Sequence, residues 1–341
     1  MTCGKYSMET IVISPFSSEQ DIRELFNDDT RFAIIPDHFP GNPLGYKTDI
    51  DNPHWVLNLL DEFPKCIFLS DYNKVGVYKK NFVPIPMMYL SEVFGHDWTY
   101  DFNMEKRPYT SSIIGGQTRI NRTLASFWLA KNYPLDQLKY HYTENDDITA
   151  VQQFINPNAS LHPRKFLFDT WDKNTLEWNN NQRLFNHLMP DIISQAYVHL
   201  GTESINPHLE APLTEKTLSA WLGGTLLLPL GDYCKNEVLA KYGFESFSNV
   251  FELRSSRIPH HHEVTIGVLE DNRDFLMDHS AVEQAWHENI GKIIHNSKQA
   301  ADKEFWKAHQ ADNLSLVKDA VEMVDFSKIH KSAEFLKIFL Q

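Results

Sequence analysis

The densest set of side chains that can bind a charged ligand lies between residues 201 and 231. The set consists of hydroxyls, carboxylates and one ammonium group, on Thr202, Glu203, Ser204, Thr214, Glu215 and Lys216. A helix that begins at Thr214 presents free backbone N–H groups and a positive dipole end, which suit phosphate oxygens. Lys216 adds a full positive charge, and the Glu215 carboxylate can accept hydrogen bonds from ribose hydroxyls. The stretch therefore predicts a nucleotide-diphosphate site; alternatively, Thr214 only caps the helix and Glu215 only favours its dipole.

A second cationic group follows a glycine turn. Residues 111–116 are typical of a strand that ends at two glycines, and Arg119 and Arg122 come shortly after it. Two arginines three positions apart in one helical turn lie on the same face. Their guanidinium forks suit phosphate oxygens, so they are candidate ligands for the same diphosphate. The alternative is a solvated basic turn, and Arg164 is a weaker candidate for the same role.

The order of these groups resembles a known family. Glu203-Ser204 follows a strand, Thr214-Glu215-Lys216 opens a helix, Gly223-Gly224 ends it, and the apolar run Leu226–Pro229 comes next. This order is similar to the donor-binding motif of the α1,3-fucosyltransferases and related two-domain glycosyltransferases. Two departures stand out: Thr202 replaces the Asn of the motif, and the gap between Ser204 and Thr214 is longer.

Two further segments resemble glycosyltransferases of large viruses and phages. Leu239–Glu252 is similar to their Leu…Gly-Phe-x-Ser/Thr-Phe stretch, and Gly115–Arg122 looks like the Asn-x-x-Arg-x-x-Arg start of their C-terminal domain. The resemblance spans about residues 110–290. It implies the GT-B architecture, in which two Rossmann-like parallel α/β domains face each other across a cleft. It also implies a nucleotide-diphospho-sugar donor with Glu215 at the ribose and Lys216 at the phosphates.

The resemblance implies no obligatory metal or other cofactor, because cationic side chains neutralise the leaving diphosphate. A catalytic base must then come from the N-terminal half, within hydrogen-bond reach of the acceptor hydroxyl. Asp37 and Asp71 each follow a predicted buried strand, so both are candidates. His38 and Glu92 are further options, and the alternative for each Asp is a loop-capping role.

The elements that position these residues follow from the hydrophobic pattern. Short apolar runs predict strands at 10–14, 32–35, 66–69, 111–116, 138–142, 196–200 and 225–229. Helical spacing occurs at 55–63, 123–131, 214–222 and 236–242, and helices dominate from 280 onward. Strands that alternate with helices predict parallel α/β units. We expect an acceptor-side domain at 1–105, a donor domain at 106–280 and a helical tail at 281–341 that can cross back, with 97–108 as a linker.

Charge and composition narrow the function classes. The chain has 341 residues with 32 Lys and Arg against 45 Asp and Glu, a net charge of −13. Such a chain repels phosphate backbones on average, which disfavours a nucleic-acid coat protein. The three scattered cysteines, Cys3, Cys66 and Cys234, form no disulfide framework. With no signal-like start and no apolar run of about 20 residues, we expect a cytoplasmic protein, in the host cytoplasm if it is viral.

Several alternatives stay open. A glycan acceptor is favoured. The alternative acceptor is a hydroxymethylated base in DNA, whose phosphate backbone could bind the basic group Lys74, Lys79 and Lys80. A non-catalytic nucleotide- or carbohydrate-binding protein would keep the donor site and lack the base. Asp49-Ile50-Asp51 lacks the preceding apolar strand of a metal-dependent transferase, and the histidines of 259–263 lack a second ligand cluster. The sequence carries no P-loop and no serine-hydrolase elbow.

Overall fold

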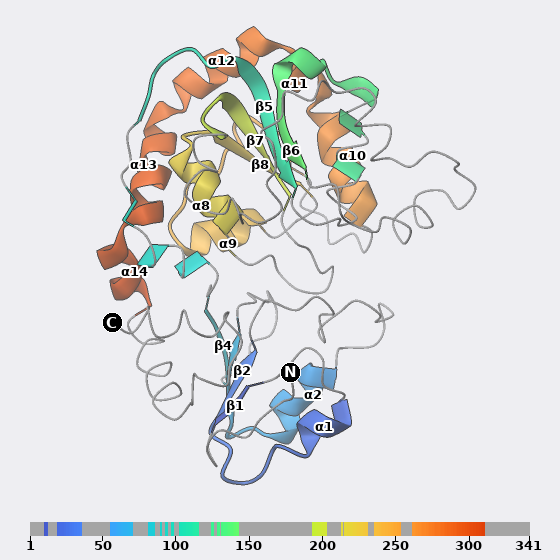
Figure 1. Ribbon diagram of the computed structural model, residues 1–341, viewed down its shortest axis with the longest axis vertical. Helices are drawn as coiled ribbons and strands as arrows, with labels where there is room; N and C mark the ends of the chain where they lie inside the picture. Colours follow the sequence, from blue (N-terminus) through green and yellow to red (C-terminus); the bar gives the residue numbers. More distant parts are fainter. Residues whose placement is uncertain are drawn as a thin grey trace, which may run out of the picture. The chain divides into compact units, whose positions relative to one another are not determined.

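The computed structural model describes the following residues: 10–12, 19–35, 55–70, 81–85, 89–90, 93–94, 97–98, 102–115, 124–125, 128–129, 131–142, 193–202, 213, 215–230, 235–253 and 261–310. The chain forms two compact units. The first comprises Met1–Trp98, Asn206–Thr214 and Asp302–Gln341, and the second comprises Thr99–Ile205 and Glu215–Ala301. Each unit contains its own sheet (Figure 1).

The first unit is built on a four-stranded parallel sheet in the order β1-β2-β3-β4. The strands are β1 (Thr10–Val12), β2 (Phe32–Ile35), β3 (Ile67–Ser70) and β4 (Phe82–Pro84). Helix α1 (Glu19–Arg23) connects β1 to β2, and α2 (Trp55–Glu62) connects β2 to β3. Phe26 stacks on Phe63 and Phe68 at ring-centroid distances of 4.4 and 5.8 Å, so aromatic packing joins the loop after α1 to the sheet.

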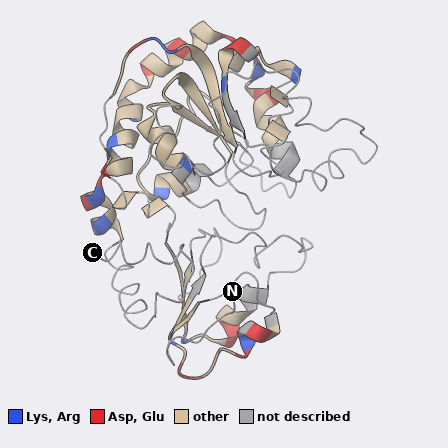
Figure 2. Ribbon diagram, viewed as in Figure 1, with Lys and Arg blue, Asp and Glu red and all other residues tan. Residues whose placement is uncertain are grey.

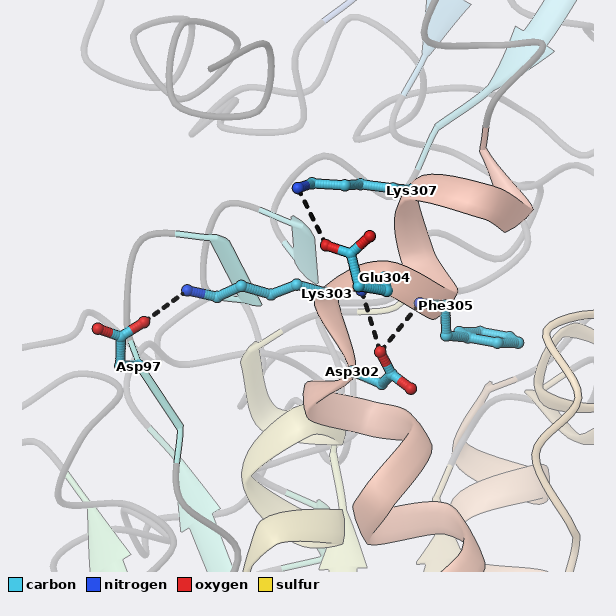
Figure 3. A network of polar contacts seen from close by, with 6 residues as sticks. All are labelled: Asp97, Asp302, Lys303, Glu304, Phe305 and Lys307. Carbon is cyan, nitrogen blue, oxygen red and sulfur yellow. Dashed lines mark hydrogen bonds and ion pairs between the residues drawn. The ribbon is translucent and has the colours of Figure 1, made fainter.

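Helix α14 (Lys303–His309) belongs to this first unit, although it lies far along the chain. The Trp306 side chain is completely buried, and its ring centroid lies 4.9 Å from that of Tyr89. Asp302 caps the helix by accepting hydrogen bonds from the backbone N–H groups of Glu304 and Phe305, both at 3.0 Å (Figure 3). Burial of the indole is the main interaction that holds α14 in place, because a buried aromatic side chain removes a large apolar area from water.

An ion pair adds little to that packing. The Lys303 Nζ atom lies 2.7 Å from the Asp97 carboxylate, and the hydrogen bond and charge of Lys303 lower the pKa of Asp97 (Figure 3). The Asp97 side chain is almost fully exposed. Exposed pairs of this kind are screened by water and salt and contribute little to stability. The Lys303–Asp97 pair therefore contributes little to the stability of the first unit, although it joins the start of α14 to Asp97.

The second unit is also built on a four-stranded parallel sheet, in the order β6-β5-β7-β8. Its strands are β5 (Tyr109–Gly115), β6 (Leu138–Tyr142), which follows the short helix η1 (Leu135–Gln137), β7 (Ala196–Gly201) and β8 (Leu226–Pro229). All residues of β7 and β8 are buried. Burial on both faces explains why these strands read as continuous apolar runs rather than as alternating patterns.

Six described helices accompany this sheet: α8 (Glu215–Leu222), α9 (Lys235–Lys241), α10 (His261–Asp271), α11 (Arg273–Met277), α12 (His279–Glu288) and α13 (Ile290–Ala301). Helix α8 packs on β7 and β8, α13 packs on α8, and α12 packs on β5 and β7. The described strands carry a single charged residue, Lys139, and the other charged residues of the described chain lie on helices and loops (Figure 2). Charge is therefore concentrated outside the sheets.

The α/β fold class is confirmed: both sheets are parallel and their strands alternate with helices. The described parts of the predicted strands and of the helices at 55–63, 214–222 and 236–242 agree with the observed elements within about two residues at each end. Strand β4 was not among the predicted strands, because a run of three residues shows no clear hydrophobic period. None of the described helices has both the length and the apolar character that a membrane span requires.

Trp306→Ala should destabilise the first unit by about 3–5 kcal/mol, the usual cost of removing a buried aromatic side chain. Denaturant unfolding measures the loss, and hydrogen exchange followed by mass spectrometry locates it in β2 and β3. Lys307→Ala, on the same helix but exposed, is the control and should stay within about 0.5 kcal/mol of the wild type. Equal loss of protection in β5 and β7 would contradict the assignment of α14 to the first unit.

Candidate functional site

The strand order of the second sheet contains a reversal between β5 and β7. The chain runs from β5 outward to β6 and then returns to β7 on the other side of β5. In open parallel sheets, ligands bind outside the carboxyl ends of the strands at such a switch point. The described strands of the first sheet follow each other in sequence order and show no reversal. Among the described strands, a switch point of this kind therefore occurs in the second sheet.

The switch point lies at the ends of β5 and β7. The Thr202 hydroxyl, which is buried, donates a hydrogen bond to the Ile114 carbonyl at 3.4 Å and joins the two strand ends. Below it, the Ser112 and His199 side chains meet at 3.0 Å between the Ser112 Oγ and the His199 Nδ1. Both side chains are buried, so this pair joins the central strands and is closed to solvent. The sequence analysis did not identify this pair. The feature that could have indicated it is His199, a histidine within the otherwise apolar run of β7.

Most of the predicted site residues lie outside the described part of the chain: Asp37, Asp71, Arg119, Arg122, Glu203, Ser204 and Thr214. The chain connectivity nevertheless relates them to the described strands. Glu203 and Ser204 begin two residues after β7, and Arg119 and Arg122 come within seven residues of the end of β5. Both predicted donor groups thus leave the sheet at the two strands that form the switch point.

The two candidate bases have a similar relation to the first sheet. Asp37 follows β2 by two residues, and Asp71 directly follows β3. Strands β2 and β3 are parallel neighbours, with Ile35 paired to Ser70 at their carboxyl ends. The other residues considered, His38, Glu92, Arg164, Asp49, Asp51, Lys74, Lys79 and Lys80, are also outside the described residues.

Helix α8 begins at Glu215, in agreement with the predicted helix start. The Lys216 side chain is half-buried in the first turn. The side chain of Glu215 is outside the described residues, although its backbone opens the helix. Helix α8 connects β7 to β8. Glu215 and Lys216 therefore lie in the connection that follows β7, one of the two strands at the switch point.

The segment Leu239–Glu252, which the sequence analysis compared with viral glycosyltransferases, is held by two buried asparagines. The Asn296 side chain accepts a hydrogen bond from the Glu245 backbone N–H and donates one to its carbonyl, both at 2.8 Å. Asn272 makes the same pair of bonds with Glu252, at 2.9 and 2.8 Å. These amides replace the partners that a neighbouring strand would supply. The irregular segment therefore has a fixed position without belonging to a sheet.

Two tyrosines near the sheet have shifted titration. Burial raises the pKa of Tyr133 to about 12. Its hydroxyl donates to the Leu276 carbonyl at 2.9 Å and also lies 2.9 Å from the Ser111 Oγ. Tyr197 donates to the Glu283 carboxylate at 2.8 Å, and this bond lowers the pKa of Glu283. Desolvation raises the pKa of Tyr197 itself. Both tyrosines are thus neutral donors at physiological pH.

The described residues offer no group of three or more His, Cys, Asp or Glu that could hold a metal ion. The histidine-rich stretch at 259–263 enters α10 at His261, but the side chains there are outside the described residues.

The far end of α8 is closed by side-chain donors and a glycine. Gly224 has a φ of +63°, a left-handed conformation that glycine adopts at helix ends. A Cβ at this position would stand 3.2 Å from the Arg107 Nη2 and 3.3 Å from the Phe102 ring. Both contacts come from the stretch that was predicted to be a linker, so part of that stretch packs into the second unit. The glycine pair at 223–224 has a physical reason: Gly224 adopts a positive φ, and a Cβ at Gly223 would stand 2.8 Å from the Ile193 Cγ2.

Comparisons with known proteins give one structural likeness. No family model matches the chain, and no curated protein matches it. Among solved structures, the chain is similar to the pneumococcal O-GlcNAc transferase GtfA in complex with UDP and GlcNAc, with a TM-score of 0.48 and 14% sequence identity. The likeness covers 92% of this chain and 57% of that chain. At this level it assigns no residue, and the site rests on the sheet topology and the side chains.

Gly224→Ala should destabilise the second unit by about 1–3 kcal/mol, because alanine is strained at positive φ and its methyl group contacts Arg107 and Phe102. Thermal unfolding measures the change. Gly291→Ala is the matched control: nothing lies within 4 Å of a Cβ there, and alanine in a helix should stabilise by roughly 0.5–1 kcal/mol. Equal effects of the two substitutions would contradict the strain at Gly224.

Proposed function

We propose that this protein is a glycosyltransferase that moves a sugar from a nucleotide-diphospho-sugar to a hydroxyl acceptor. The observation that carries the proposal is the switch point between β5 and β7. Both predicted donor-binding groups follow these two strands, and α8 opens with Glu215 and Lys216 in the next connection. A reversal in a parallel sheet, phosphate-binding cations after it and a helix start are the parts of a nucleotide site.

In this proposal the donor lies at the carboxyl edge of the second sheet. The Glu215 carboxylate accepts hydrogen bonds from the ribose hydroxyls. Lys216, Arg119 and Arg122 contact the diphosphate, and Glu203, Ser204 and Thr214 complete the surroundings of the donor. Preorganised cations of this kind stabilise the charge that develops on the leaving group, which is commonly the main source of rate enhancement. No metal ion is required where side chains supply that charge.

The first unit supplies the base. The acceptor hydroxyl oxygen forms a bond with the anomeric carbon of the donor sugar, and the bond from that carbon to the diphosphate oxygen breaks. The proton of the hydroxyl goes to the carboxylate of Asp37 or Asp71, and the nucleoside diphosphate leaves. Both residues follow neighbouring parallel strands, and these two strands end at the same edge of the first sheet. A cleft between two such units, the GT-B arrangement, is part of the proposal.

The net charge of −13 favours a glycan acceptor over duplex DNA, because the average surface repels a phosphate backbone. A cytoplasmic location is likewise part of the proposal.

Donor binding provides the first test. A thermal-shift screen with UDP-, GDP- and dTDP-sugars should give a shift with one nucleotide class, because a ligand that binds the folded state stabilises it. Lys216→Met should weaken that binding by roughly 10- to 100-fold, the value of a hydrogen bond to a charged group. Titration calorimetry measures the dissociation constant.

Lys298→Met, which removes one exposed positive charge from α13, is the charge-matched control and should bind the donor like the wild type. No shift with any of the three nucleotide classes would overturn the proposed function. A shift that Lys216→Met leaves unchanged would remove Lys216 from the phosphate site.

Turnover provides the second test. Asp37→Asn or Asp71→Asn, whichever residue is the base, should lower the rate of sugar transfer or donor hydrolysis by about 10²- to 10⁴-fold. Donor affinity should stay unchanged, because the base contacts the acceptor and not the nucleotide. If both variants keep full turnover, neither residue is the base.

A further inference from the structure

Side chains from three separate parts of the chain bind the carbonyl groups at the C-terminal end of α8. The Ser297 hydroxyl donates to the Trp221 carbonyl, and the Trp286 Nε1 donates to the Gly224 carbonyl at 2.7 Å. The Arg107 Nη1 donates to the Gly223 carbonyl at 3.1 Å. The last carbonyls of a helix have no partner within the helix, so such donors determine how its end is fixed.

Arg107 is the one of these three donors that carries a charge. The residue is 5% exposed, and the same Nη1 atom donates to the Ala196 carbonyl at 2.6 Å. Because Ala196 begins β7 and Gly223 follows α8, one side chain links the helix end to the first residue of the strand. A cation at this end of a helix also interacts favourably with the negative end of the dipole.

The position of the guanidinium is itself fixed. It lies over the Trp286 ring at 4.6 Å from the centroid, within the range of a cation–π contact. The backbone N–H of Arg107 donates to the Tyr197 hydroxyl at 3.1 Å, and Tyr197 donates onward to Glu283 on α12. Phe102 stacks on Trp286 at 5.5 Å and 12°. A side chain with this many partners has one conformation.

We propose that Arg107 is a positioning residue for the donor site: it fixes the C-terminal end of α8 and thereby the direction in which the first turn presents Glu215 and Lys216. This inference rests on the proposed function. Arg107 does not touch the donor, because it acts on the opposite end of the helix.

The length of α8 makes this action physically direct. Eight residues span roughly 12 Å, so the helix moves as one rigid rod. When Arg107 is lost, Ser297 and Trp286 still hold neighbouring carbonyls, and the helix stays folded but can tilt about them. A small tilt at Gly223 displaces Lys216 at the other end. A charge that must meet a diphosphate at hydrogen-bond distance is sensitive to such a displacement.

The test compares Arg107→Met with Arg107→Lys and Lys106→Met in the full chain. Methionine keeps the apolar stem and removes the donors, whereas lysine keeps the charge and can donate to one of the two carbonyls. Lys106→Met is the matched control, because Lys106 is the neighbouring cation but its side chain is 72% exposed, 3.7 Å from Glu283. The probe is the nucleoside diphosphate that shifts the wild type, titrated by calorimetry well below the melting temperature.

Arg107→Met should raise the dissociation constant about 3- to 30-fold, the usual range for coupling through a packed network. The stoichiometry should stay at the wild-type value. A purely structural role would lower the fraction of binding-competent protein and leave the dissociation constant unchanged, so the two readouts separate the roles. Arg107→Lys should recover part of the affinity, and Lys106→Met should bind like the wild type.

A double-mutant cycle with Lys216→Met completes the test. Distant, independent sites add in their effects on binding, whereas residues that act through one element do not. We expect Arg107→Met to have a smaller effect once Lys216 is gone, because only the contact of Glu215 with the ribose is then left to be displaced.

The outcomes that would overturn the proposed function differ from those that would overturn the positioning role. Binding of no nucleotide by the wild type overturns the proposed function, and the inference falls with it. Nucleotide binding that Arg107→Met leaves unchanged, or effects of Arg107→Met and Lys216→Met that add, overturn the positioning role alone and leave the proposed function standing.

Discussion

The parallel pairing of β5 with β7 is the constraint on which both ends of the second unit depend. Its register runs from Tyr109 opposite Ala196 to Ile113 opposite Leu200. At the carboxyl end, the pairing brings Ile114 beside Thr202 and creates the switch point. At the amino end, it places Arg107, two residues before the strand, beside the Ala196 carbonyl. One ladder of hydrogen bonds thus sets the place of the switch point and the place where the end of α8 is fixed.

The chain has a net charge of −13, yet the Arg107 guanidinium is buried. The net charge of the chain therefore does not predict the charge at a particular site. Arg107 leaves water, and that cost is offset only where carbonyls and an aromatic face receive the charge. The Ala196 and Gly223 carbonyls and the Trp286 ring supply these partners. The proposed donor site depends in the same way on a few cations that the whole-chain balance hides.

Local pattern was sufficient for much of the fold. Every described strand except β4 follows from the apolar runs, and the start of α8 follows from the Thr-Glu-Lys helix start, because burial and helix capping act over a few residues. The buried polar groups were not predictable in this way. Asn272, Asn296 and Ser297 were not singled out from the sequence, and in the structure they are buried and bind backbone groups of other segments. Their role depends on which backbone lies opposite, and sequence spacing carries no such information.

The sequence by itself determined the class of the fold, the order of strands and helices, and the residue types available to a diphosphate. These properties are local, since hydrophobic period and charge are read within one or two turns of chain. Only the tertiary structure decided that β7 returns to the far side of β5, that α14 packs with the first sheet, and that Arg107 belongs to the end of α8. Each of these joins residues that lie far apart in the sequence, and such contacts follow from the packing of whole elements rather than from any pattern along the chain.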